Sequence, residues 1–204
     1  MAKKQIKTFR HSLHQPPGVY LLIGIGAILL AVALVAFTGM VKATESAKSP
    51  TVCIGWTNCA NALADGGKAA SLTVPLPLNS KYINKSTYSN YGYSISNASR
   101  IDSVVVALDG WGSNANARFL VKVSDNGGIT WGQGHTVLGS QRFPINIDVS
   151  QDRRWSGTRL GNKYFKIQVS CYSDDGVTLT TCNLDWIPVK VTYAAPLIRK
   201  FLFF

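Results

Sequence analysis

Residues 101–109, "IDSVVVALD", decide the fold class that this sequence predicts. The run is apolar and rich in valine, and turn-forming residues stand on both sides of it, in "SNAS" and "GWGSN". β-Branched residues are enriched in strands because their side chains pack well on a pleated surface. An apolar run of this length between turn signals is typical of a β-strand. The stretch therefore predicts a strand.

Similar short runs recur on both sides of this one, separated by turn residues. Period-two alternation, the pattern of strands with one solvent-facing side, is clearest in "FLVKVS" and "YFKIQVS". The further predicted strands are residues 71–78, 91–95, 117–124, 143–149, 163–171 and 184–193. Prolines make the first of them an edge or loop-flanking strand. About seven to nine strands of this kind predict a mainly β domain, an antiparallel jelly-roll-like β-sandwich.

Composition supports a β protein and argues against a nucleic-acid-binding one. The chain has 21 Lys and Arg residues against 10 acidic residues, and Glu45 is its one glutamate. Helical surfaces usually rely on Glu, Lys and Ala, whereas this chain uses Ser, Thr, Asn, Gly, Val and Tyr. Four bases stand near the start without an acid: Lys3, Lys4, Lys7 and Arg10. We see no block of bases with interleaved aromatic residues and expect no nucleic-acid partner.

Residues 19–41 form an apolar run without a charge. A helix of this length spans about 30 Å of hydrocarbon, so we predict one transmembrane α-helix. The bases of residues 1–18 predict a cytoplasmic N-terminus and a single-pass protein of the cell membrane, with its C-terminal domain outside. Residues 42–55 are then a polar linker, residues 56–193 the extracytoplasmic β-sandwich, and residues 194–204 an apolar C-terminal tail.

Two alternatives for the apolar segment stay open. Val41-Lys-Ala43 resembles the cleavage site of a signal peptide, although the run exceeds the usual h-region of about 7–15 residues. Gly18 resembles the end of a pilin-type leader. However, Pro16-Pro17 replace the basic residue that normally precedes such a site, and Ile23 stands where Glu is usual. The uncleaved anchor is our expectation.

Four cysteines follow the apolar segment. An even number on the outer side of a membrane indicates two disulfides. We predict local pairing, Cys53 with Cys59 and Cys171 with Cys182. The alternative is a zinc site made by the four thiolates, but the C-x2-C spacing that such sites usually have is missing.

Residues 124–131, "SDNGGITW", resemble the Asp box S-x-D-x-G-x-T-W of sialidases and other propeller proteins, with Asn126 in place of the aspartate. A propeller would need several copies of this motif, and we find one. We therefore predict a structural turn. Asn and Gly tolerate positive φ and can reverse the chain there, Ser124, Asp125 or Thr130 can bond turn amides, and Trp131 can fold onto the sandwich.

Four stretches together resemble a family of surface β-sandwich modules of archaea and bacteria, with jelly-roll or galactose-binding-like folds. They are "WTNCANALADGGKAAS", "YGYSISNASRIDSVVVALDG", "VKVSDNGGITW" and "LDWIPVKVTY". The likeness covers residues 56–193. It departs at Cys59, where the family usually has Pro, and at Gly66-Gly67, where Asp-Gly is usual. The resemblance implies a module of surface, adhesion or appendage proteins; fold likeness alone does not supply a function.

Two groups of residues are candidates for sugar binding, which needs aromatic faces beside amides or acids. The first is Trp111 with Asn114, Asn116 and Arg118; the second is Tyr172 with Asp174 and Asp175. The alternative for the tryptophan is that it caps the sandwich core. We expect no cofactor, and a structural calcium at the two aspartates is a further metal candidate.

Catalysis is not expected. Residues 56–193 hold one histidine, His135, and no glutamate, whereas a glycosidase needs two carboxylates in different roles. No G-x-S-x-G elbow surrounds a serine. Asn84 and Asn97 begin glycosylation sequons. The end of the tail is wholly apolar, and we expect Phe201, Leu202, Phe203 and Phe204 to contact the membrane interface or a partner chain. The alternative is a disordered chain end.

These observations predict a membrane-anchored, surface-exposed structural or adhesive protein. We expect it to be an accessory subunit of a larger membrane, cell-surface or appendage assembly, with other chains contacted through the transmembrane helix and the tail. The first alternative is a carbohydrate-binding surface module. The second is a glycan-active enzyme.

Overall fold

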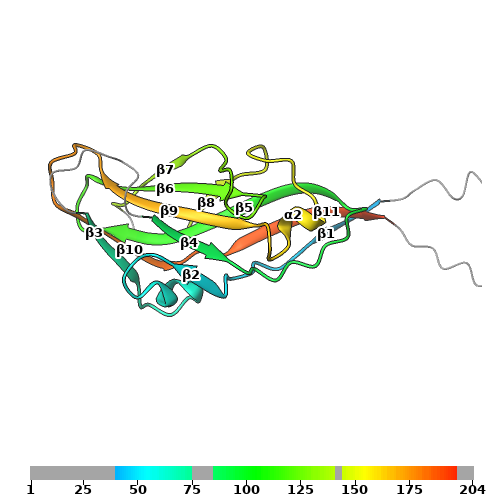
Figure 1. The fold of residues 1–204 in the computed structure, drawn as a ribbon, viewed down its shortest axis with the longest axis horizontal. Coiled ribbons are helices and arrows are strands. Elements are labelled where there is room, and N and C mark those ends of the chain that lie inside the picture. Colours follow the sequence, from blue (N-terminus) through cyan, green and yellow to red (C-terminus); the bar gives the residue numbers. More distant parts are fainter. Residues whose placement is uncertain (1–39, 75–84, 141–143, 197–204) are drawn as a thin grey trace, which may run out of the picture. The chain divides into compact units, whose positions relative to one another are not determined.

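Two antiparallel sheets face each other in the computed structural model, which describes residues 40–74, 85–140 and 144–196 (Figure 1). In the first sheet, β1 (Met40–Thr44) pairs with β11 (Val189–Pro196), and β3 (Ala70–Val74) pairs with β10 (Thr180–Trp186). β11 and β10 both pair with one edge of β5 (Arg100–Gly112), and β8 (Ile145–Asp148) pairs with its other edge. The second runs in the order β2 (Val52–Ile54), β4 (Lys85–Ser89), β9 (Lys166–Ser173), β6 (Ala117–Ser124) and β7 (His135–Leu138). The predicted mainly β sandwich is confirmed.

The strand order is that of a jelly roll. Along the chain, β3 lies in the first sheet, β4 in the second, β5 in the first, β6 and β7 in the second, β8 in the first, and β9 in the second. The chain then returns to the first sheet as β10 and β11, which pair end to end with β5. This alternation between two sheets is what two interlocked Greek keys produce. The short helices η1 (Cys59–Leu63) and α2 (Gly157–Leu160) lie in the connections.

The core fills the space between the sheets. From Val104 to Gly110 of β5 every second residue is buried, including Val106 and Leu108, so one face of this part of the strand lines the core. Phe119 of β6 and Ile167 of β9 are fully buried opposite that face. The alternation that predicts strands in the sequence is therefore the alternation between core and surface.

Two predicted strands differ from the structure. Residues 184–193 form parts of β10 and β11 rather than one strand, with Ile187 and Pro188 between them; a proline has no N–H to give to a ladder. Residues 91–95 belong to no strand, although their burial alternates. Asn90 and Gly92 have positive φ, 60° and 71°, which a regular strand does not accommodate.

The first described residues also differ from the predicted boundaries. Met40 and Val41, expected at the end of the transmembrane helix, belong to β1 and pair with β11. The expected linker, residues 42–55, contains the rest of β1 and all of β2. Within the described part of the chain, no helix combines the length and apolar character that crossing a membrane requires. The rest of the predicted span, residues 19–39, lies outside the described residues, as do residues 1–18.

Both predicted disulfides are confirmed. Cys53 of β2 bonds to Cys59 of η1, and Cys171 of β9 bonds to Cys182 of β10. The second bond joins the two sheets through the core, because β9 and β10 lie in different sheets. Among the described residues there is no free cysteine.

Three buried tyrosines make the domain sensitive to alkali. Burial raises the pKa of Tyr88 from 10.0 to about 12 and raises the pKa of Tyr91 and Tyr93 as well. The hydroxyls of Tyr91 and Tyr93 donate to the carbonyls of Ile187 and Val189. Between about pH 10 and 12 the folded state keeps protons that the unfolded state loses, so stability should be full below pH 10 and fall as pH rises.

We expect a spectrophotometric titration to show that three of the eight tyrosines lose their protons only when the domain unfolds. A Tyr88→Phe variant should remove one of these three late-ionising groups. Ionisation of all eight in one phase at about pH 10 would contradict the expectation.

Candidate functional site

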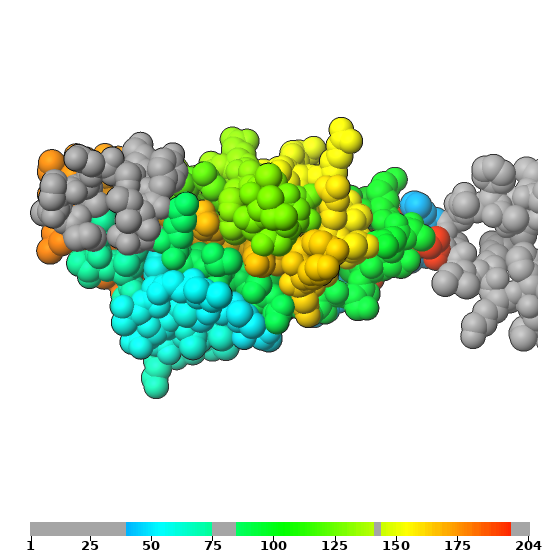
Figure 2. Space-filling view, viewed as in Figure 1, coloured from blue at the N-terminus to red at the C-terminus, as the bar shows by residue number. Residues whose placement is uncertain are grey.

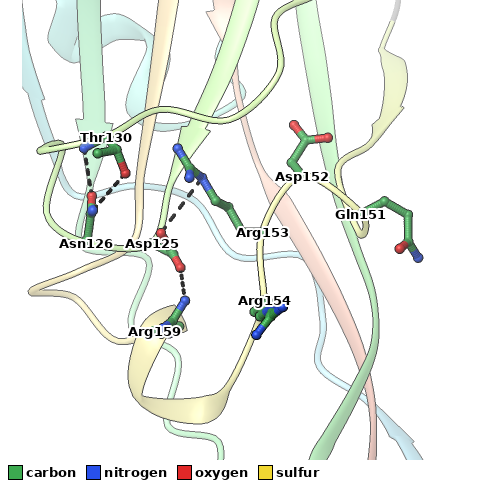
Figure 3. Close-up of a pocket in the computed structure, with 8 residues that line it drawn as sticks. All are labelled: Asp125, Asn126, Thr130, Gln151, Asp152, Arg153, Arg154 and Arg159. Carbon is green, nitrogen blue, oxygen red and sulfur yellow. Dashed lines mark hydrogen bonds and ion pairs between the residues drawn. The ribbon is translucent and has the colours of Figure 1, made fainter.

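A hollow of about 570 Å³ opens among loops that follow β6 and β8. The residues that line it are Asp125, Asn126, Thr130, Gln151, Asp152, Arg153, Arg154 and Arg159 (Figure 3). A second hollow of about 320 Å³ shares Asp125, Asn126 and Arg159 and adds Thr158 and Tyr164. Figure 2 shows the yellow-green and yellow segments that carry these loops side by side at the surface. The two hollows are neighbours, since they share three lining residues.

The first wall is the turn after β6, residues 124–131. The Ser124 hydroxyl accepts from the amides of Asn126 and Gly128, and Asn126 Oδ1 accepts from the Thr130 amide. Gly127 and Gly128 have φ of 78° and 90°, a region that favours glycine. The prediction of a structural turn with a serine bonding its amides is confirmed. The turn also holds Asp125 at the floor of the hollow, 7% exposed.

The second wall is α2, a single turn that carries Arg159. The Ser156 hydroxyl caps it by accepting from the Arg159 amide, and Asn97 Oδ1 accepts from the amide and hydroxyl of Thr158 at 2.7 and 2.6 Å. Gly157 lies so close to the loop before β5 that a Cβ there would stand 2.0 Å from the Ile95 carbonyl oxygen. These contacts fix the position of the Arg159 backbone.

The third wall is the loop between β8 and α2. The Asp152 amide donates to the Val149 carbonyl, and Trp155 Nε1 donates to the same carbonyl at 3.0 Å. Trp155 also packs edge-on against Phe165, with ring centroids 5.6 Å apart. The loop is thus anchored on both sides of Arg153 and Arg154.

Charges inside the site are partly matched. Asp125 lies between two guanidinium groups: Oδ2 accepts from Arg159 Nη1, and Oδ1 is 3.8 Å from Arg153 Nε (Figure 3). Asp152 Oδ2 accepts from His135 Nε2 at 2.8 Å. The lining holds three arginines and two aspartates, a net charge of +1. The arrangement suits recognition of a polar, hydrogen-bonding ligand, since charged groups and amides face the hollow from three segments.

Most of the candidates from sequence lie elsewhere, and their polar atoms bond to one another. Asn114 Nδ2 donates to the Leu179 carbonyl, and Asn116 Nδ2 donates to Asp175 Oδ2 at 2.7 Å. Arg118 Nη2 donates to Asp174 Oδ2 at 2.9 Å. The structure thus brings Asn116 and Arg118 of the first group to the two aspartates of the second. The result is a self-bonded cluster that ties the loop after β5 to the turn after β9.

The two aromatic candidates are not part of that cluster. Trp111 stands in β5 rather than in a loop, half-buried on the sheet face turned away from the core and opposite Asn183 of β10. Tyr172 of β9 is 7% exposed, and its hydroxyl lies 3.3 Å from the Thr136 hydroxyl. They belong to different sheets, so they do not form a shared platform.

The calcium candidates are engaged by protein donors. Hydrogen bonds from Thr178, and further ones from Ser173 and the Val177 amide, hold the pKa of Asp175 well below its usual range. Among the described residues, a different set of carboxylates comes together: Asp65, Asp109 and Asp185 have oxygens within 4.8 Å of one another. Three carboxylates supply part of the shell of about six to eight oxygens that calcium takes.

The modification and tail candidates fall mostly outside the described residues. Asn84 and the apolar tail residues Phe201, Leu202, Phe203 and Phe204 lie outside them. Asn97 is exposed, but its side chain caps α2, and Ser99 of the same sequon is 8% exposed. The bonds from Thr158 use Asn97 Oδ1, whereas a glycan would be attached to Nδ2.

Sequence reasoning missed the hollow. It singled out Asp125 and Thr130 only as turn formers, and it named none of the three arginines. The signal was present in "QDRRWSGTR", residues 151–159, where three arginines stand among turn-forming residues after a strand. Basic residues gathered on one loop are the electrostatic mark of a site for anions.

No protein-family model and no curated protein matches the chain. Solved structures with some likeness include a truncated AlyQ with CBM32 and alginate lyase domains (TM-score 0.40, 12% identity, 77% of this chain and 34% of that chain). Others are TmCBM61 in complex with β-1,4-galactotriose (0.36, 13%, 75% and 88%) and the mud crab tombus-like virus (0.31, 10%, 98% and 92%). The chain spans about a third of the first of these. Since the TM-scores of these three structures are below 0.5, the fold assignment rests on the strand order.

Proposed function

We propose that this protein is a non-catalytic, surface-displayed binding module that recognises a glycan in the hollow between the β6 turn, the β8 loop and α2. The observation that carries the proposal is the hollow itself. Its volume of about 570 Å³ falls in the range of small-ligand sites, roughly 300–1,000 Å³. Its lining is polar, as a ligand rich in hydroxyl groups requires.

Preorganisation supports binding at this place. Each wall is fixed by hydrogen bonds inside the protein: Ser124 and Asn126 hold the turn, Asn97 and Ser156 hold α2, and Trp155 anchors the loop. A site that is already ordered loses little conformational entropy when it binds. Loops on a rigid sandwich are the usual place for recognition.

The carboxylates favour binding over hydrolysis. A glycosidase needs one carboxylic acid to protonate the leaving group and a second carboxylate to act as base or nucleophile. Here Asp125 is engaged by Arg159 and Arg153, and Asp152 by His135. Both carboxylates therefore serve to position basic side chains.

Surface display and adhesion are part of the proposal. Two disulfides support an oxidising compartment. Anchoring through residues 19–39 would hold the module at a membrane, and an accessory role in an assembly would use that segment and residues 197–204. Extraction in a non-glycosidic detergent, followed by size-exclusion chromatography, tests the anchoring and the accessory role. A protein that stays in solution only with detergent supports anchoring, and other chains that co-migrate with it support the assembly.

A glycan array probed with the full-length protein tests the binding function. Hydrogen exchange with the tightest-binding saccharide then locates the site. We expect protection in residues 125–130 and 151–159 and unchanged exchange around Trp111 and in residues 174–178. Protection around Trp111 alone would place the site on the outer sheet face. An array without any binder would refute the function.

A further inference from the structure

We infer that the glycan bound in this hollow is acidic, carrying carboxylate or sulfate groups that pair with Arg154 and Arg159. This inference rests on the proposed function and adds the charge of the ligand. It follows from which of the five charged residues of the lining already have a partner of opposite charge.

The protein's own acids do not neutralise the site. Asp125 serves two arginines at once, and Asp152 is bonded to His135, which lies outside the lining. Arg154 is exposed and has no hydrogen-bond or ion-pair partner anywhere in the described parts of the chain. One guanidinium group is therefore left for a ligand.

Arg153 adds a second incomplete match. Its side chain is 19% exposed, and its buried Nε and Nη2 have no hydrogen-bond acceptor among the described residues. Its nearest counter-charge, Asp125 Oδ1, is 3.8 Å away and is shared with Arg159 through the other oxygen. A partly buried cation of this kind raises the positive potential of the hollow, because low-dielectric surroundings screen it weakly.

The position of Arg159 suits a ligand that spans more than one sugar. Arg159 lines both hollows, and its side chain is 48% exposed despite the bond to Asp125. Beyond it, Tyr164 lines the second hollow, and Lys163 Nζ stands 5.3 Å from the centre of that ring. A saccharide with an acidic group on successive units would meet a basic side chain in each hollow. Guanidinium groups bind carboxylate and sulfate through paired hydrogen bonds.

The experiment uses the full-length protein in a polyoxyethylene detergent, which has no sugar head group. Four probes are titrated: a galacturonic acid tetramer, the neutral galactose tetramer made by reducing its carboxyls, a sulfated galactose tetramer, and a single-stranded DNA of matched charge. The matched variants are Arg154→Gln and Lys190→Gln. Lys190 is also an exposed base, but it lies in β11, away from the hollow lining.

We expect at least one acidic tetramer to bind about tenfold more tightly than the neutral tetramer and the DNA, since one charge-assisted hydrogen bond is worth about that factor. Arg154→Gln should remove most of this preference and Lys190→Gln none of it, and added salt should weaken binding. The tighter of the two acidic probes identifies the substituent.

Two results overturn the inference without touching the proposed function: equal binding of the neutral and acidic tetramers, or an unchanged preference in Arg154→Gln. Equal binding of the DNA overturns it as well, because charge alone would then explain the affinity. Absence of binding by any saccharide overturns both the inference and the proposed function.

Discussion

Removing the Cys171–Cys182 bond should lower the free energy of unfolding by about 3 kcal/mol, because a cross-link that closes a loop of this length restricts the unfolded chain by roughly that amount. The bonded residues are 11 apart in sequence, 4% and 0% exposed, and join the two sheets. For a domain of this size, the change corresponds to a fall in Tm of about 6–12 °C. Calorimetry on the double variant Cys171→Ala/Cys182→Ala measures it.

The other disulfide is the matched control. Cys53 and Cys59 are 6 apart and partly exposed, and the bond ties β2 to η1 within one edge of the sandwich. The double variant Cys53→Ala/Cys59→Ala should lose about 2 kcal/mol. An equal or larger loss in this control would show that the bond between the sheets does not contribute more to stability than the bond within one edge.

Replacing Asp125 by alanine should cost about 3 kcal/mol. Asp125 is almost fully buried, and its loss leaves Arg153 with two buried nitrogens and no nearby counter-charge. Breaking a buried pair typically costs about 3–5 kcal/mol; the lower end applies because Arg159 is half exposed and screened by water. Denaturant titration measures the loss, with Asp125→Asn expected to lose less because it keeps the shape and one acceptor.

The control for this variant is a surface pair of the same chemistry. Asp102 accepts from Arg100 Nε at 2.9 Å, and the Arg100 side chain is 69% exposed. Asp102→Ala should change stability by no more than about 1 kcal/mol. Similar losses of stability in the two alanine variants would mean that the effect of Asp125 comes from removing one negative charge and not from its burial.

Much of the sandwich could be predicted because its strands obey simple alternation. Residues 117–124 coincide with β6, and residues 101–109 lie inside β5. Prediction failed where the structure of a segment depends on residues that are distant in the sequence. Residues 91–95 alternate like a strand, yet Tyr91 and Tyr93 reach across to backbone carbonyls near β11 and pair with no strand. Met40 and Val41 are apolar and continue a longer apolar run, so only pairing with β11 reveals β1.

The site was harder to predict than the fold. Asn114, Asn116 and Arg118 looked suited to binding because each offers hydrogen bonds. A sequence does not show that Asp175 and Asp174 occupy the donors of Asn116 and Arg118, or that the Leu179 carbonyl occupies the Asn114 amide. The hollow is built from segments that are about thirty residues apart, the β6 turn and the β8 loop with α2. Their meeting depends on the jelly-roll connection, which no local pattern encodes.

The pairing of β1 with β11 also has a mechanical consequence. Met40 lies opposite Pro196, so the chain enters and leaves the domain side by side (Figure 1). Ladder bonds run perpendicular to the strands. A force that pulls these two ends apart therefore loads one bond after another and peels β1 away easily. A force directed along β1 loads the ladder bonds together and meets far greater resistance. The domain should be strong when it is pulled along β1 and weak when its own ends are separated.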